Sequence, residues 1–436
     1  MRGSNARTGY HTAMSTRSRR RVAPPPARLA DLPAWQCYDC HGCARCCSGD
    51  LAIMITPAEA DAIVAQGWLD APGLAGQRLF LERGGQLYLA HRDDGACVFL
   101  DADGRCGIHG RFGFAAKPLA CRAYPFMPLP VGDTVRLDLR FDCPSVAVNQ
   151  GRPLAAQRAE IAALVGSALT VTRLDPVPVR AELTWPQEAL DQVTAIVESL
   201  LSQDGLCLTG RIAAAVNLVA GLDTPRLSEI TADEVQPLLA TTLVAVSRMA
   251  QQDPLHRRRL PSGVRTMFRQ LLGLYGRVDR LAQPVSPWTR SRQAAALAWG
   301  RGRVPALRGD WPRVRFAALE GAWGPLDAEV EAVFTRFYRL KLGAQAFCGV
   351  GFFGYPYLAG LQALWLTYPA LLWCARLFAA GDGRHELRAS DAERALQVID
   401  HRHGRSPQMA LPGEQRRLAA LCERETLRAL IVAYGT

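Results

Sequence analysis

The sequence predicts a mainly α fold, in which a small cysteine-rich metal-binding module with a few short strands precedes an all-α helical domain. Two observations support this fold class. Nine of the 13 cysteines lie before residue 150, and from about residue 153 apolar residues recur at the three- and four-residue spacing of helices. We expect an arm over residues 1–30, the module over 31–150 and the helical domain over 151–436.

The net charge of +11 lies mainly in the first 30 residues, which contain seven arginines and no acid. Because this segment has arginine, serine and proline but no apolar period, we expect it to be a disordered arm. The rest of the chain carries a charge of only +4, and its lysines are Lys117 and Lys341 alone. The charge is thus not spread over a folded surface, and nucleic-acid binding is not expected.

Local signals place several short elements in the module. Thr56-Pro57-Ala58-Glu59 is a capping box with proline at the first helical position, so a helix is expected to begin there and to end near Gly67. Turn chemistry at residues 101–104 is expected to bring Cys97 and Cys106 close together. Alternation and composition predict three short strands, at residues 86–90, 97–100 and 134–140.

The remainder of the chain is expected to be helical. Ser390-Asp391-Ala392-Glu393 and Thr184-Trp185-Pro186-Gln187 supply helix starts within it. The apolar spacing predicts eight helices, over residues 153–169, 186–202, 234–250, 262–282, 327–348, 357–379, 391–401 and 414–434.

An uncharged stretch from Leu342 to Ala375 is long enough to span a bilayer. Two glutamines, two prolines and five glycines interrupt it. We therefore expect a buried helical hairpin and no membrane insertion, with a transmembrane helix as the alternative. If this stretch closes over a pocket, five aromatic residues would line a site for a methyl donor or a peptide: Phe352, Phe353, Tyr355, Tyr357 and Trp365.

The densest chemical signal is a run of five cysteines between Cys37 and Cys47. Thiolates are the soft ligands of zinc, copper(I) and iron–sulfur clusters, and short C-x2-C loops let them converge. The nine cysteines before residue 150 can be divided into ligand sets, or partitions, in two ways. One partition follows the ferredoxin spacing C-x2-C-x2-C-x3-C, although Ser48 stands after the last cysteine where proline is usual. The cysteine of Cys143-Pro144 could then serve as a distant substitute ligand. The ferredoxin partition uses Cys37, Cys40, Cys43 and Cys47.

The other partition omits Cys37 and carries a family resemblance. Its motifs are Cys40-His-Gly-Cys43-Ala-Arg-Cys46-Cys47, Ile55-Thr-Pro-Ala-Glu59, the segment from Cys97 to Cys106-Gly-Ile-His109, and Cys121-Arg122-Ala-Tyr124-Pro125. Over residues 36–145 this order resembles the YkgJ-type cysteine-cluster family, described as zinc- or iron-chelating. It is also similar to flagellin lysine-N-methylases, which join such a module to a helical region. The resemblance implies eight metal ligands: Cys40, Cys43, Cys46, Cys47, Cys97, Cys106, Cys121 and Cys143.

Other sites receive less support. A disulfide framework conflicts with the odd cysteine count and with the lack of a secretory signal, so we expect a reducing, cytoplasmic location. We expect that His41 and His109 do not bind the metal, or only form hydrogen bonds to its ligands, with direct ligation as the alternative. The positive charge of Arg122 either offsets the negative charge of a thiolate cluster or belongs to an ordinary surface residue. Residues 349–354 match the glycine-rich fingerprint of dinucleotide-binding sites by letter. Because they follow a helical pattern and not a strand, we expect an ordinary loop there.

Three functions remain. We favour an iron–sulfur cluster, of the 4Fe-4S type, with a redox or modifying role. The first alternative, implied by the resemblance, is an S-adenosylmethionine-dependent protein lysine N-methylase whose substrate is a protein. The second is a zinc-stapled interaction protein without catalysis. A radical S-adenosylmethionine enzyme is not expected, because its C-x3-C-x2-C triplet would need a cysteine where Asp50 stands.

Overall fold

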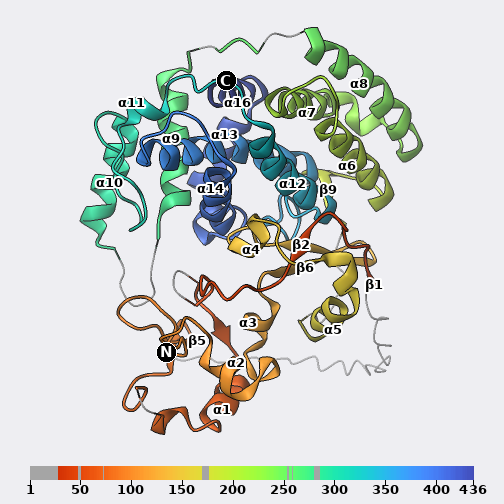
Figure 1. The fold of residues 1–436 in the computed structure, drawn as a ribbon. Coiled ribbons are helices and arrows are strands. Elements are labelled where there is room, and N and C mark those ends of the chain that lie inside the picture. Colours follow the sequence, from red (N-terminus) through yellow and green to blue (C-terminus); the bar gives the residue numbers. More distant parts are fainter. Residues whose placement is uncertain are drawn as a thin grey trace, which may run out of the picture.

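The computed structural model describes residues 28–47, 51–71, 73–168, 176–252, 255–257, 259–278 and 285–436. The fold is mainly α-helical with short strands, and a cysteine-rich N-terminal region precedes the helices, so the predicted fold class is confirmed. Figure 1 shows a small lobe with α1, α2 and β5 at one end and the long helices at the other. Residues 1–27 of the predicted arm lie outside the described residues, and the last part of it forms strand β1 (Arg28–Leu29).

The small lobe contains one antiparallel sheet and several short helices. The strands β3 (Met54–Ile55), β5 (Gln86–Leu89) and β4 (Phe80–Arg83) pair in that order. The helical elements are α1 (Pro57–Val64), η1 (Trp68–Asp70), α2 (Gly107–Phe112), η2 (Phe114–Ala116) and α3 (Leu119–Ala123). Their apolar side chains form a separate small core that includes Ile55, Trp68 and Phe99.

Two local predictions differ in outcome. The helix start is confirmed, because the Thr56 hydroxyl accepts from the Glu59 amide and the Glu59 carboxylate accepts from the Thr56 amide. The strand predicted at 97–100 is wrong. Cys97 and Cys106 form only isolated bridges with His91 and Leu100, and the turn at 101–104 follows directly, which leaves too little extended chain for a ladder.

A second sheet joins the module to the helices. Its order is β1, β7 (Thr134–Leu139) and β6 (Phe126–Val131), with β1 parallel and β6 antiparallel to β7. Three further short pieces flank it: the β2 (Cys37–Tyr38) and β8 (Arg152–Pro153) pair, the α4 helix (Pro144–Ala147) and the β9 (Pro178–Arg180) and β10 (Leu183–Thr184) pair. The buried residues of β7 belong to the large core of the helices. The boundary at residue 150 stays a prediction.

The helical region follows the predicted periods with four differences. Its 3-10 turns are η3 (Leu154–Gln157), η4 (Pro225–Glu229) and η5 (Pro407–Ala410). The α-helices are α5 (Arg158–Ala168), α6 (Gln187–Leu201), α7 (Leu208–Leu222), α8 (Ala232–Gln252), α9 (Ser262–Gly276), α10 (Pro287–Trp299), α11 (Phe316–Leu319), α12 (Ala328–Ala344), α13 (Tyr357–Gly381), α14 (Ala389–Arg402), α15 (Pro412–Cys422) and α16 (Arg424–Gly435). Helices α7 and α10 and the four-residue helix α11 were not predicted. The predicted helix over 414–434 is two helices, because Glu423 interrupts it and caps the amides of Glu425 and Thr426.

The uncharged stretch lies in the middle of this region. Among the described residues, one helix, α13, is long and apolar enough to cross a membrane, and 94% of its most apolar window is buried inside the protein. Its hydroxyl-bearing side chains have partners within the core, since Thr367 bonds Tyr338 at 2.9 Å and Tyr368 bonds Thr209 at 2.9 Å. The fingerprint over 349–354 is the loop before this helix, as predicted.

Candidate metal centre

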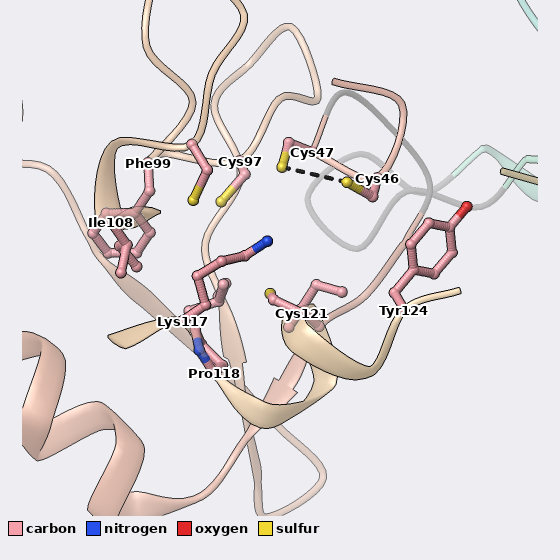
Figure 2. A pocket seen from close by; sticks show the side chains of 12 residues that line it. Cys46, Cys47, Cys97, Phe99, Ile108, Lys117, Pro118, Cys121 and Tyr124 are labelled. Carbon is pink, nitrogen blue, oxygen red and sulfur yellow. Dashed lines mark hydrogen bonds between the residues drawn. The ribbon is translucent and has the colours of Figure 1, made fainter. Parts of the chain in front are cut away.

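Five cysteines from four separate segments line one cavity in the small lobe. They are Cys46, Cys47, Cys97, Cys106 and Cys121. The remainder of the lining is almost entirely apolar, and the cavity has a volume of about 30 Å³. That is room for an ion or a compact inorganic cluster and far below the roughly 300 Å³ that organic ligands occupy. Figure 2 shows the labelled sulfurs directed toward a shared space, with the Lys117 ammonium group among them.

Main-chain contacts hold these segments together. The Cys97 amide donates to the Cys47 carbonyl at 2.6 Å, which places the loop after β5 against the loop that carries the C-x2-C motif. Cys106 is the N-cap residue of α2, at the end of the predicted turn. Cys121 lies in α3, and this helix is attached to α1 because the Leu119 amide donates to the Glu59 carboxylate at 2.7 Å.

Cys46 and Cys47 present their sulfurs as a pair. The two sulfur atoms lie 3.7 Å apart. Two thiolates on one tetrahedral ion, each about 2.3 Å from the metal, would lie about 3.8 Å apart. The pair is thus already at the separation that one shared metal ion requires.

The thiols of the cavity differ in acidity. The hydrogen bond from Cys47 lowers the pKa of Cys46 to about 6, and the same bond together with burial raises the pKa of Cys47. Burial raises the pKa of Cys97 to about 11 and that of Cys121 to about 12. A metal ion binds thiolates, so loading this cavity at neutral pH would release protons from most of its ligands.

The donor set fits a soft metal. Among the described residues, no three histidine, cysteine, aspartate or glutamate side chains stand close enough together to hold a metal ion as they are placed. The cavity nevertheless has five cysteine side chains and no carboxylate in its lining, and thiolate sets of this kind select zinc or iron–sulfur clusters. To share a single metal ion, the sulfurs would have to come closer together than they are placed here.

The other three predicted ligands lie outside this cavity lining. Cys40 and Cys43 are exposed, whereas Cys143 is buried and is the N-cap residue of α4. Burial and then the nearby Cys43 thiol, among other groups, raise the pKa of Cys143 to about 11, so these two cysteines are neighbours. Cys37, which the resemblance left out, lies in β2.

Neither candidate histidine lines the cavity. The His41 Nδ1 atom lies 2.6 Å from the Ser145 hydroxyl, and the His109 ring packs edge-on against Phe114 at 5.8 Å between centroids. Both have roles in local packing or hydrogen bonding. The side chain of Arg122 is not part of the cavity lining either.

Besides the apolar side chains of the lining, two polar residues of the cavity were not identified from the sequence as site residues: Lys117 and Tyr124. The Tyr124 hydroxyl donates to Asp142 at 3.1 Å, and Asp142 also lies 2.8 Å from His401 Nδ1 in α14. Although burial raises the pKa of Asp142, Arg140 and His401 hold it well below its usual range. This ionised carboxylate therefore links the cavity wall to the helical domain. The rarity of lysine in this chain was the one signal for Lys117.

Comparison with known proteins agrees with the chemistry of the cavity. Residues 39–145 match the family model CxxCxxCC, which is described as "Putative zinc- or iron-chelating domain". The matched segment contains all eight predicted ligands. Searches of curated proteins and of solved structures return no match. The comparison supports metal binding by the module.

Proposed function

We propose that the cysteine cavity holds an iron–sulfur cluster of the 4Fe-4S type. The observation that carries this proposal is the convergence of five cysteines on one small apolar cavity, with three more cysteines in the matched segment. A tetrahedral zinc ion and a 4Fe-4S cluster each use four protein ligands, but among the described residues no three of the sulfurs stand close enough together to hold a single ion, and a cluster accepts ligands that stand further apart. A cluster with cysteine ligands draws them from several segments of the chain, as they are arranged here.

In this proposal the protein side chains define the surroundings of the cluster. The five cavity cysteines are the candidate ligands, Phe99 and Ile108 exclude water, and the Lys117 ammonium offsets the negative charge of the thiolates. Tyr124 closes one wall and is fixed by its hydrogen bond to Asp142. A cluster in this position would supply one-electron transfer.

Zinc is the second candidate, and the spacing of Cys46 and Cys47 favours it. Their 3.7 Å separation suits two ligands of a single tetrahedral ion. In that case the module is a structural staple for an interaction protein without catalysis.

Metal analysis distinguishes the two candidates. Protein purified without oxygen is expected to be brown and to contain iron with acid-labile sulfide. The Cys97→Ser variant is expected to lose at least nine-tenths of its iron. Cys207→Ser is the matched control, because Cys207 is an exposed N-cap residue of α7 far along the chain, where serine also caps well. Colourless protein with one zinc per chain would support the zinc candidate and refute the cluster.

A methylase activity is a further candidate, supported by one cavity in the helical region. This cavity has a volume of about 570 Å³ and lies between α7, α13, α15 and α16. The size falls within the range of organic ligand sites. Of the five aromatic residues expected around a methyl-donor pocket, Tyr355 lines it. Phe352, Tyr357 and Trp365 are buried in the core, and the partly buried Phe353 packs against that core. Equilibrium dialysis with S-adenosylmethionine tests this candidate, and a lack of binding at millimolar concentration would refute it.

A further inference from the structure

Three arginines line a further pocket of the helical region, and none of its lining residues belongs to the small lobe. This pocket has a volume of about 300 Å³ and is bordered by the loop before α9, by the end of α11 and by α16. Its arginines are Arg257, Arg259 and Arg265. The one acidic residue of the lining is Glu320.

Glu320 does not neutralise these arginines, because its carboxylate is already committed. One oxygen accepts from the buried Arg269 guanidinium at 2.9 Å, and the other accepts from the Tyr434 hydroxyl at 2.9 Å. Arg257 donates to the main-chain carbonyl of Glu320 instead. Within the described part of the chain, no carboxylate forms an ion pair with Arg259 or Arg265.

The first turn of α9 adds to the positive potential of the pocket. Leu260, which precedes this turn, and Arg265, which lies within it, both line the pocket. The cap residue Pro261 offers no side-chain acceptor, and the first turn contains no acid. The first amides of the helix therefore lack the partners that capping residues usually provide, and the helix dipole favours an anion at this end.

We propose that this pocket binds a small molecule that carries phosphate groups. Three guanidinium groups with one internally paired carboxylate suit an anion with two or more charges, and each guanidinium can bind two phosphate oxygens at once. The volume lies at the lower end of the range for organic ligands, so a diphosphate with a small substituent fits better than a large cofactor. The site is separate from the metal centre and does not depend on the identity of the metal.

Calorimetric titration of the full-length, metal-loaded protein with inorganic pyrophosphate tests the proposal. Binding is expected, and it should weaken as salt is added. The Arg259→Gln and Arg265→Gln variants are each expected to bind at least tenfold more weakly. Because no described carboxylate pairs with either arginine, both variants are expected to fold and to keep the metal content of the unmodified protein. Arg248→Gln, an exposed position on α8 outside the pocket, is the matched control and is expected to bind normally.

Three results would overturn the proposal. The first is an absence of pyrophosphate binding at millimolar concentration. The second is equal binding by the unmodified protein and the two pocket variants. The third is binding to vesicles that contain phosphatidic acid without binding to free pyrophosphate, which would assign the arginines to a lipid surface.

Discussion

At the scale of single residues, the eight predicted ligands lie in two places: five line the cavity, and Cys40, Cys43 and Cys143 lie outside its lining. The turn at 101–104 brings Cys97 and Cys106 to one cavity, as the sequence suggested. Spacing could not show that Cys143 would lie in the large core, because its position depends on where α4 packs. Tyr124 lay within a recognised motif, but its role depends on Asp142, a contact that only the fold creates.

Buried histidines at the end of α14 predict acid sensitivity. Burial lowers the pKa of His403 to about 3, so this ring stays neutral in the folded protein while the unfolded chain takes up a proton below about pH 6.5. The unfolded state thus binds more protons, and stability falls as the pH falls, by about 1.4 kcal/mol per pH unit for this group. The unmodified protein should therefore lose about 2 kcal/mol between pH 7 and pH 5 through His403.

Denaturant unfolding at pH 7 and at pH 5 measures this loss. In His403→Gln, an acceptor for the Tyr275 hydroxyl remains, since that hydroxyl lies 2.8 Å from His403 Nδ1 in the unmodified protein. The variant should lose about 2 kcal/mol less than the unmodified protein over this range. His256→Gln, at an exposed position, should behave like the unmodified protein. Equal pH dependence in all three proteins would contradict the expectation.

At the scale of elements, the strand and the helices that the sequence patterns failed to predict each have a feature that hides them. Strand β6 was missed because it contains Pro128 and Pro130, and proline is tolerated there because β6 is the edge of its sheet. Helix α7 is apolar and buried on nearly all sides, so it lacks the amphipathic period that reveals other helices. Helix α10 exposes most of its surface and buries chiefly Leu297, which leaves too few apolar positions to form a pattern.

The capping box of α1 is expected to support the metal centre through α3. Removing the cap alone, in Thr56→Ala, should cost about 1 kcal/mol and leave metal content unchanged. Glu59→Ala should do more, because the Glu59 carboxylate also accepts from the Leu119 amide, two residues before Cys121. We expect metal affinity to fall at least fivefold in Glu59→Ala, as measured by competition with a chelator. Equal metal affinity in the two variants would show that the link to α3 does not matter.

Strand β1 sets a limit on truncation of the N-terminal arm. Leu29 and Leu32 are buried in the large core, and the Arg158 guanidinium donates to the carbonyls of Leu29 and Ala30. A chain that starts at residue 28 should keep its Tm and metal content. A chain that starts at residue 33 should lose about 3 kcal/mol or more, because two leucines leave the core. If both truncations had the same effect, β1 would have no stabilising role.

At the scale of the whole molecule, most buried apolar side chains belong to one of two cores. The small core includes Cys97 and lies against three more cavity cysteines, whereas the large core contains most of the helical region and β7. A buried ion cluster joins β7 to the helices, since the Lys341 ammonium lies 2.9 Å from Asp138 and 2.8 Å from Asp400. Periodicity predicted the large core well, but a pairing between strand and helix residues 203 positions apart leaves no local trace in the sequence.

Metal removal is expected to loosen only the small lobe. The cavity joins four segments of the small lobe, and the apolar core of this lobe is far smaller than the large core, so hydrogen exchange in residues 51–121 should speed up at least tenfold when a chelator removes the metal. Helix α13, at the centre of the large core, should keep its protection. Uniform acceleration throughout the chain would mean that the two cores unfold together.

The most direct test of the account is X-ray absorption spectroscopy at the metal edge of protein purified without oxygen. A thiolate centre in the cysteine cavity predicts a first shell of sulfur at about 2.3 Å, and a second shell of iron if the centre is a cluster. The sulfur shell should be lost in Cys97→Ser and retained in Cys207→Ser. A first shell of oxygen or nitrogen, or protein without bound metal, would contradict the central claim that these five cysteines form a metal site.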